Sequence, residues 1–338
     1  VAYDPKFYKS KLFSKQYRTY QYDKATDTYS VANTSAMSSV TEWRSDTATP
    51  TTQLSLNYEN KFQNKHNVKA LLLFETRKWQ TSELSGKRNT LMDAVDQIYA
   101  GLIDDAREIN GSADRNANVG LVGRFDYDYL SKYLVQASFR YDGSSKFYNK
   151  KWGFFPSLSV GWRISEEKFM EWARPSLSNL KFRVSYGSLG NQNVSSFYTF
   201  LRMITLSDFD TFNFGSDTKA KYSSIGAPIA QNLTWETARQ WNIGADLAMF
   251  NNRLNFDVTY YKTNNKNQYF TIDAPLGSGY ESYYINAGNI QNQGFEASAS
   301  YRFDFAKDWS WKTEFNISYN DNKIKELDAR LKDGVQIG

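Results

Sequence analysis

Apolar and polar side chains alternate at every second position through much of this 338-residue chain. Between Val119 and Tyr129 one set of alternate positions is mostly apolar or aromatic, while the other carries Arg124, Asp126 and Asp128. Successive side chains of a strand point to opposite faces, so the pattern predicts a sheet with one apolar and one polar face. The same alternation recurs at 54–58, 68–74, 133–141, 158–164, 182–186, 241–249, 254–260, 295–303 and 311–319.

The predicted strands are long. We count about twelve of them, and most span roughly eight to fourteen residues, with the weakest signals at 12–21 and 27–37. A tilted strand needs ~9–11 residues to cross a bilayer, whereas strands of globular proteins most often have ~5–6. The lengths therefore favour an all-β, antiparallel transmembrane β-barrel over a soluble sandwich.

The predicted connections alternate between short and long. Outer-membrane barrels have short periplasmic turns and long extracellular loops, and a soluble sandwich has no reason to keep such regular alternation. One long connection contains Leu91, Val95, Ile98, Leu102 and Ile109 at helical spacing, which predicts a short helix there. The short connections are 22–26, 63–65, 130–132, 251–252 and 305–308, the medium one is 165–179, and the long ones are 38–50, 80–118, 143–156, 188–234 and 263–290.

Composition agrees with a barrel and excludes several other classes. The mean hydropathy is −0.64 and no stretch of about 18 apolar residues exists, which excludes a helical membrane protein. A barrel remains possible, because only alternate residues face lipid. The chain has no cysteine, so disulfides, thiolate zinc sites and cysteine nucleophiles are excluded. The net charge of +5 is spread along the chain, and no nucleic-acid-binding stripe is evident.

No group of residues predicts catalysis, so we expect no enzyme activity, no cofactor and no metal site. The single histidine, His66, has no visible partner in the sequence and is interpreted as solvated or interfacial. Asp126 and Asp128 could be paired acids or calcium ligands, but Arg124 and Arg140 nearby favour charge pairing on a polar barrel wall. The glycine-rich segment 276–280 is interpreted as a turn.

Aromatic residues in the long connections are the only candidate ligand contacts. Aromatic rings can stack on the apolar faces of sugars, but an aromatic girdle with loop packing accounts for most of them. No ligand-binding residue is therefore assigned. The candidates are Trp79, Trp152, Phe154, Phe155, Tyr198, Tyr222, Tyr280, Tyr283 and Tyr284.

Several ordered motifs between about Val119 and Tyr319 resemble the SusC-like (SusC/RagA) family of TonB-dependent outer-membrane transporters of Bacteroidetes. The most specific stretch reads NLTWETARQWNIGADL at 232–247 and FNNRLNFDVTYYK at 250–262, followed by APLGSGY at 274–280 and NAGNIQNQGFEAS at 286–298. The other blocks are ASFRYDGSSK at 137–146, WGFFPS at 152–157, SVGWRIS at 159–165 and LKFRVSYG at 180–187.

This resemblance implies a plugged barrel of roughly 22 strands in the outer membrane of a Gram-negative cell. Residues 1–338 would be part of one barrel domain, with the plug domain, the TonB-contacting segment and the final strands outside this chain. The start without methionine and the unpatterned end likewise predict a segment of a larger protein. Implied partners are a SusD-like surface lipoprotein, TonB, outer-membrane lipid and the imported glycan or peptide.

The leading hypothesis for function is TonB-driven import of a bulky nutrient, a glycan or oligosaccharide in the first place and a peptide in the second, under a SusD-like lid. The alternatives are a passive porin-like barrel and a soluble carbohydrate-binding β-protein. A plug sequence would separate the first two, and detergent-free solubility of the full protein would favour the third. The sequence does not reveal the substrate.

Overall fold

The computed structural model describes residues 2–35, 37–90, 96–102, 108–174, 176–194, 197–202, 204–208, 221–226, 233–275, 277–279, 282–306 and 308–327. Its contacts divide the chain into two compact units. The first comprises Val1–Thr52 and Arg77–Ala117, and the second comprises Gln53–Thr76 and Asn118–Gly338.

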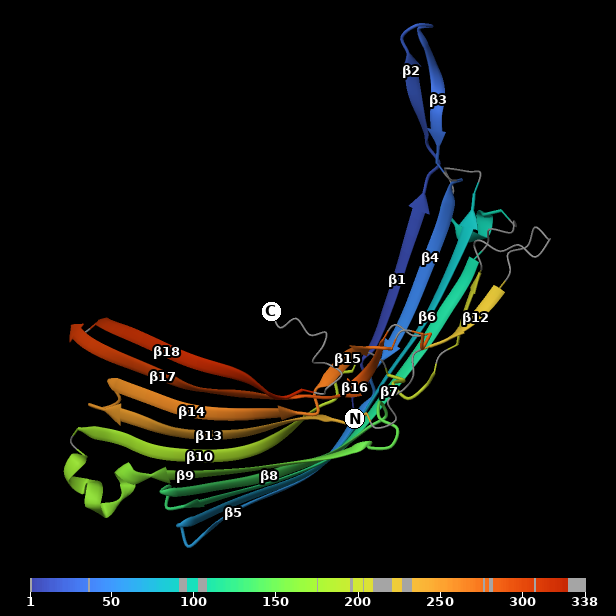
Figure 1. Ribbon diagram of the computed structural model, residues 1–338. Helices are drawn as coiled ribbons and strands as arrows, with labels where there is room; N and C mark the ends of the chain where they lie inside the picture. Colours follow the sequence, from blue (N-terminus) through green and yellow to red (C-terminus); the bar gives the residue numbers. More distant parts are fainter. Residues whose placement is uncertain are drawn as a thin grey trace. The chain divides into compact units, whose positions relative to one another are not determined.

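The first unit is an antiparallel sheet in which β1 pairs with β4 and β4 pairs with β6. The connection between β1 and β4 contains a separate hairpin of β2 and β3 (Figure 1). A single 3₁₀ turn, η1, follows β6. The elements are β1 (Pro5–Ser14), β2 (Arg18–Asp23), β3 (Thr28–Thr34), β4 (Ser39–Ala48), η1 (Ile98–Ala100), and the parts of β6 (His66–Asn89) and β7 (Glu108–Tyr129) that belong to this unit.

The second unit contains a broad antiparallel sheet, whose strands lie side by side (Figure 1). Over the described residues, the main sheet of the chain has twelve strands, but these are not the twelve predicted ones, because β4 was not predicted and the predicted strand at 27–37 lies in the separate β2–β3 hairpin. Two small hairpins, β11–β12 and β15–β16, lie in connections of this unit. Its elements include β5 (Thr51–Phe62), β8 (Tyr133–Ser144), β9 (Trp152–Arg163), η2 (Ile164–Glu166), η3 (Lys168–Ala173), β10 (Leu177–Asn191), β11 (Ile204–Asp208), β12 (Lys221–Ile225), β13 (Glu236–Met249), β14 (Leu254–Lys266), β15 (Tyr269–Asp273), β16 (Ser282–Asn286), β17 (Asn289–Ala306) and β18 (Trp309–Glu326).

The strand register places the apolar positions of neighbouring strands directly opposite one another. Cross-strand partners share a face, so one continuous apolar row crosses the sheet. These side chains do not meet in a dry core, because Val184 is 41% exposed and Ile243 is 51% exposed. The row consists of Tyr127, Val135, Val160, Val184, Ile243, Tyr260, Phe295 and Tyr319, each paired with the next.

The opposite face carries an equally continuous polar row. A shift of one residue would turn every side chain to the other face, so the pattern and the register support each other. The two-faced sheet predicted from the alternation is therefore confirmed. The polar row consists of Asp126, Gln136, Ser159, Ser185, Asn242, Tyr261, Gly294 and Asn320.

Long and short connections alternate along most of the chain, as the sequence predicts, but not around β9, where the connection 145–151 has 7 residues and the following connection 164–176 has 13. The 7-residue connection 145–151 is much shorter than the predicted loop 143–156. The tight turn after β13 uses positive φ angles at Asn251 (56°) and Asn252 (64°), which asparagine tolerates better than most residues. The described part of the glycine-rich segment is a turn, with positive φ at Gly277 and Gly279.

Two predicted loops are wrong. Most of the predicted loop 38–50 is strand β4, and the predicted loop 80–118 consists largely of the ends of β6 and β7. In these segments polar residues occupy both faces, so they lack the alternation that identifies a half-buried strand. The long connection at this end of the chain is instead the one between β1 and β4, which holds the β2–β3 hairpin.

The predicted helix around Leu91–Ile109 is also wrong where the structure describes it. Ile98 belongs to the short turn η1, Leu102 lies outside any helix, and Ile109 lies in strand β7. Leu91 and Val95 fall outside the described residues. Helical spacing of five apolar residues is a weak signal here, because a strand end and a turn can reproduce it by chance.

In the part of the chain that the structure describes, no helix is long and apolar enough to cross a membrane.

Candidate functional site: the polar face of the sheet

The strongest polar cluster of the second unit centres on Arg183 in β10. Its Nε atom donates to Asp246 Oδ1 at 3.0 Å in the neighbouring strand β13. Its Nη2 atom reaches one strand further and donates to Asp257 Oδ2 at 2.7 Å and Thr259 Oγ1 at 2.6 Å in β14. One guanidinium thus ties three adjacent strands together through charge-assisted hydrogen bonds.

Gly244 makes this crossing possible. It lies directly opposite Arg183 in β13, and a Cβ at this position would lie 2.8 Å from Arg183 Cζ. The guanidinium therefore lies over the backbone of β13, in the space that a side chain would occupy. The guanidinium holds its N–H donors in a fixed planar arrangement, which suits this bridging role better than a lysine ammonium does.

A second arginine repeats the arrangement on the same face. Arg140 in β8 donates from Nε to Asp142 Oδ2 at 3.0 Å, and its Nη2 lies 3.9 Å from Glu75 Oε1 in β6. The strand between them is β7, where a Cβ on Gly120 would lie 2.6 Å from Asp142 Oδ1 and 3.3 Å from Arg140 Nη2. Both arginines therefore cross an intervening strand near a glycine.

Two further acids of this face, Asp126 and Asp128, also have partners. Arg124 binds Asp126 through Nε at 2.8 Å and Nη2 at 3.1 Å, and Asp128 Oδ1 accepts a hydrogen bond from the Ser131 backbone. Within the described residues, no group of three or more histidine, aspartate and glutamate side chains is arranged to hold a metal. The face thus carries charges of both signs in local pairs, as a hydrated wall does.

The apolar face carries aromatic residues near both ends of its strands. Trp152 stacks on Tyr141 with ring centroids 5.0 Å apart and an interplanar angle of 11°, and Phe154 packs near Phe139. Near the opposite ends, Tyr129 stacks on Tyr133. Two aromatic bands flanking an apolar zone are the girdles of an outer-membrane barrel.

His66 lies in the second of these bands and has partners that the sequence could not reveal. Its Nδ1 atom is 2.8 Å from the Tyr127 hydroxyl, and its ring packs against Tyr129 with centroids 4.8 Å apart. Both partners come from β7, which is distant in sequence but adjacent in the sheet. The contacts agree with an interfacial histidine held by tyrosines.

A small apolar core packs the long connections of the second unit. Phe147, Phe155, Leu233 and Trp235 are buried together, and Trp235 Nε1 donates to the Lys151 carbonyl at 3.0 Å. Tyr269 packs against this core, and burial raises the pKa of its hydroxyl well above the ordinary value.

Lys146 links the connection 145–151 to the segment that follows β10. Its Nζ atom donates to the Gln192 carbonyl at 3.2 Å and lies 5.2 Å from the centre of the Phe197 ring. Its side chain is nearly buried, and burial lowers the pKa of the ammonium group. The Thr199 hydroxyl also donates to the Lys146 carbonyl at 2.6 Å. The connections 145–151 and 192–235 are therefore packed into one ordered layer where they are described.

The candidate aromatic residues fall into separate places. Trp152 and Phe154 belong to the apolar face, Phe155 belongs to the buried loop core, and Tyr283 packs in a second small core with Ile272 and Ile285. Tyr284 is exposed on β16, Trp79 lies in β6 and Tyr198 lies in a turn. The side chain of Tyr222 and all of Tyr280 lie outside what the structure describes. Where they are described, the candidate rings therefore do not form one shared binding site.

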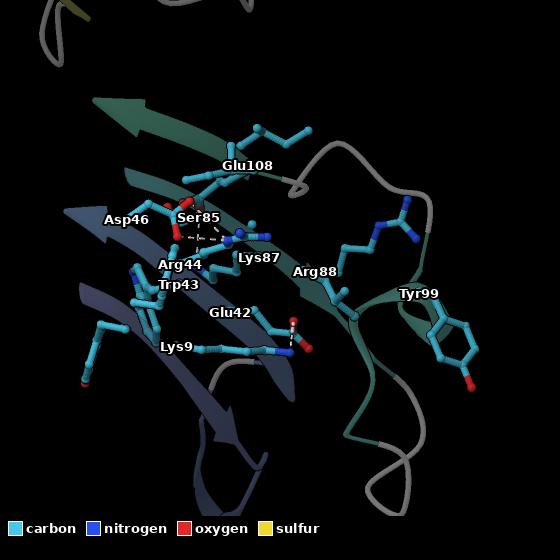
Figure 2. A pocket seen from close by; sticks show the side chains of 16 residues that line it. Lys9, Glu42, Trp43, Arg44, Asp46, Ser85, Lys87, Arg88, Tyr99 and Glu108 are labelled. Atoms are coloured by element: carbon cyan, nitrogen blue, oxygen red, sulfur yellow. Dashed lines mark hydrogen bonds and ion pairs between the residues drawn. The ribbon is translucent and has the colours of Figure 1, made fainter. Parts of the chain in front are cut away.

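The first unit contains a groove of about 810 Å³ (Figure 2). Exposed apolar side chains line it, including Phe7, Leu84 and Ile109, and Ile98 lies over Gly86, where a Cβ would be only 3.0 Å away. Figure 2 shows Lys9 pointing toward Glu42, and their charged groups are 3.8 Å apart. The groove combines an apolar floor with paired charges, and its own residues do not indicate a ligand.

Comparisons with known proteins agree with this architecture. The family model for the TonB dependent receptor-like β-barrel matches residues 2–337. TonB-dependent receptor P39 of Formosa agariphila is 32% identical over 295 residues, covering 83% of this chain and 26% of the relative. TonB-dependent receptor SusC of Bacteroides thetaiotaomicron is 34% identical over 226 residues, covering 65% and 22%. A chain from the structure of the RagAB peptide transporter superposes with a TM-score of 0.77 at 23% identity, covering 87% of this chain and 32% of that one.

The structural likeness at 23% identity establishes the fold, and the family model with the receptor relatives establishes the family. The family groups receptors rather than enzymes. The chain spans about a quarter of the length of the curated relatives that it matches, 26% of one and 28% of another. The predicted fold class, the SusC-like resemblance and the outer-membrane location are thereby confirmed. This chain belongs to the TonB dependent receptor-like β-barrel family and forms part of the wall of such an outer-membrane barrel.

Proposed function

We propose that this chain is part of the wall of an outer-membrane importer that takes up a bulky nutrient in a TonB-driven cycle. The observation that carries the proposal is the register of the sheet, which aligns one apolar row and one polar row across eight strands. An apolar face suits lipid, and a polar face suits a water-filled lumen. Residues 1–338 then belong to one barrel domain, with the plug that gates the lumen supplied by a segment outside this chain.

The pairing of charges on the polar face bears on the class of substrate. Arg183, Arg140 and Arg124 each bind carboxylates of the same wall, so the wall offers a hydrated surface without a strong field of one sign. Such a surface favours large uncharged solutes, and we propose a glycan or oligosaccharide as the substrate class. A peptide is the second candidate, because the structurally similar RagAB assembly is described as a peptide transporter.

We further propose a SusD-like surface lipoprotein as the lid, and TonB as the energy-coupling partner through a segment outside this chain. The long connections supply a large extracellular surface, and the loop core around Phe147 and Trp235 keeps part of it ordered. In this proposal the chain itself performs no catalysis. It binds, encloses and passes the substrate, which needs a polar wall and a mobile cover rather than reactive side chains.

The test is uptake of labelled oligosaccharides and oligopeptides by the native organism in three strains: wild type, a strain without this gene and a strain without TonB. The proposal expects that loss of either gene abolishes uptake of one oligosaccharide class and leaves peptide uptake unchanged. Uptake that persists without TonB but requires this gene would indicate a passive porin. Loss of peptide uptake alone would make the peptide the substrate class.

A further inference from the structure

The β2–β3 hairpin has one aromatic face and one polar face. Tyr20 lies opposite Val31 and Tyr22 lies opposite Tyr29, so these four side chains share a face. The rings of Tyr22 and Tyr29 pack with centroids 5.1 Å apart. The other face carries Thr19, Gln21, Asp23, Thr28, Ser30 and Asn33.

Among the residues that the structure describes, the aromatic face of the hairpin is exposed. Every residue of β2 and β3 is exposed, with Tyr20 at 58% and Tyr29 at 72%. Figure 1 draws the hairpin as a ribbon of its own that continues past the ends of β1 and β4. A two-stranded ribbon alone is at best marginally stable in water, and exposed apolar faces of this kind mark interaction surfaces.

Hydrogen bonds between the two flanking segments close the base of the hairpin. The Tyr17 backbone N–H donates to Ser35 Oγ at 2.7 Å, and the Ser35 N–H donates to the Tyr17 carbonyl at 2.8 Å. The Gln16 N–H donates to Ser38 Oγ at 2.7 Å, and Ser38 is itself buried. These bonds close the base of the hairpin at two levels, so its two strands leave the connection together.

We propose that the aromatic face of the β2–β3 hairpin, formed by Tyr20, Tyr22, Tyr29 and Val31, is a latch that docks on an uncharged surface of the SusD-like lipoprotein lid. This inference rests on the proposed function and adds to it the surface that the lid uses. The latch belongs to the long connection between β1 and β4. Long connections of outer-membrane barrels are extracellular, which is the side where the lid binds.

The chemistry of the face favours a protein partner over a sugar. The four side chains carry no charge, Arg18 lies only at the base of the same face, and the Tyr22 hydroxyl is already bonded to Asp27 Oδ1 at 2.7 Å. The centre of a protein interface is poor in charge and rich in tyrosine. The Tyr22 and Tyr29 rings are tilted by 44° rather than coplanar, so they do not form a flat platform for a pyranose.

The size of the face argues for a partner that is held elsewhere as well. Three tyrosines that are about half exposed offer roughly 300 Å² of contact surface, whereas a stable complex needs about 800 Å² from each partner. The latch alone would therefore bind weakly and release quickly. A lid that must open and close needs such a contact, with its permanent attachment at other loops.

Photo-crosslinking in the full-length receptor within native outer membranes tests the latch directly. A benzophenone amino acid replaces Tyr29 on the aromatic face, or Ser30 on the polar face as the matched control. The proposal expects a crosslink to the lipoprotein from position 29 and none, or a far weaker one, from position 30. Equal crosslinks from both positions, or a crosslink from position 29 to a second receptor or to another protein, would overturn it.

A kinetic measurement with threonine variants completes the test. Threonine keeps strand propensity, so Tyr20→Thr with Tyr29→Thr removes the aromatic surface, whereas Gln21→Thr with Ser30→Thr alters only the polar face. Dissociation of the lipoprotein from the purified complex should be about tenfold faster for the first pair and within about twofold of wild type for the second. If the lipoprotein binds the wild-type receptor but dissociates from both variants at the wild-type rate, the proposed latch is wrong, whereas the proposed lipoprotein lid is not contradicted. If no lipoprotein copurifies with the wild type, the proposal of a lipoprotein lid is contradicted.

Discussion

At Gly244 the absence of a side chain decides where the guanidinium of Arg183 can lie. The guanidinium needs the space above β13 to reach Asp257 and Thr259, and a Cβ would lie 2.8 Å from its Cζ atom. If position 244 carried a Cβ, either Arg183 would lose these partners or strand β13 would be strained. If Arg183 leaves, the carboxylate of Asp257 stays unpaired on the wall, where it needs water or another cation.

Gly244→Ala should therefore destabilise the barrel by about 1–3 kcal/mol through overpacking and loss of the hydrogen bonds to β14. The measurement is urea unfolding of the full-length protein in detergent micelles. Gly187→Ala is the control, because Gly187 lies on the same face of β10 and its added Cβ would make only ordinary contact, 3.5 Å from Ser157 Oγ. Equal stability of the two variants would show that the crossing contributes little.

Glu167 is a second residue whose contacts lead to a testable prediction. It lies between η2 and η3, outside the spanning strands, and hydrogen bonds from Tyr133 first, then Trp162 and Lys132, lower the pKa of its carboxyl. A lowered pKa in the folded state means that ionised Glu167 stabilises the fold above the ordinary carboxyl pKa. That contribution disappears as the pH falls through the lowered pKa.

Wild-type protein should accordingly lose stability on acidification below about pH 4.3, the ordinary value for glutamate, and Glu167→Gln should lose less over the same range. The midpoint of urea unfolding, measured in micelles at a series of pH values, checks this. Parallel pH profiles for the two proteins would mean that the bonds to Glu167 do not contribute to folding.

The contacts of single residues were only partly accessible from the sequence. The pairing of Arg124 with Asp126 was expected, because residues two apart share a face of a strand. The reach of Arg183 to β14 was not, because it depends on the register of two successive strand pairs and on a glycine midway. The combination of an arginine opposite a glycine on neighbouring polar faces is the signal that would find it once the register is known.

At the scale of elements, the strands were predictable where one of their faces is apolar. Strands β8, β13 and β14 follow the alternation closely, since lipid on one side and water on the other impose opposite requirements on successive residues. Strand β4 and the end of β6 were missed. Glu42, Arg44 and Asp46 occupy one face of β4, and Thr41 and Ser45 occupy the other, so no apolar period remains to be detected.

The small apolar core around Phe147 packs the long connections of the second unit. Disrupting it should loosen these connections and leave the strands stable. Phe147 is fully buried with Trp235 and Phe155, and Phe→Ala changes at such sites cost about 3–5 kcal/mol locally. Phe147→Ala should therefore speed limited proteolysis within 192–235 more than tenfold, while the strands stay protected. Lys150→Ala is the control, because Lys150 lies in the same connection and its side chain is exposed. Similar cleavage rates for both variants would mean that the core does not order these connections.

At the scale of the whole molecule, the account depends on one sheet that has a lipid face and a lumen face. The polar face carries arginine–carboxylate pairs within the wall, and aromatic pairs mark both ends of the apolar face. Family membership, fold class and location followed from sequence patterns. The substrate did not, because its contacts depend on loops whose sequences carry no periodic signal.

The lack of cysteine makes the central claim directly measurable. Single cysteines at Val184, Ser185, Asn242 and Ile243 of the full-length protein can carry a nitroxide label in lipid vesicles. The measurement is the power saturation of each label's spectrum with oxygen, which concentrates in lipid, against that with a water-soluble nickel complex. The account predicts high oxygen exposure at 184 and 243 and low oxygen exposure at 185 and 242. The reverse alternation, or no alternation, would contradict the assignment of the apolar face to lipid.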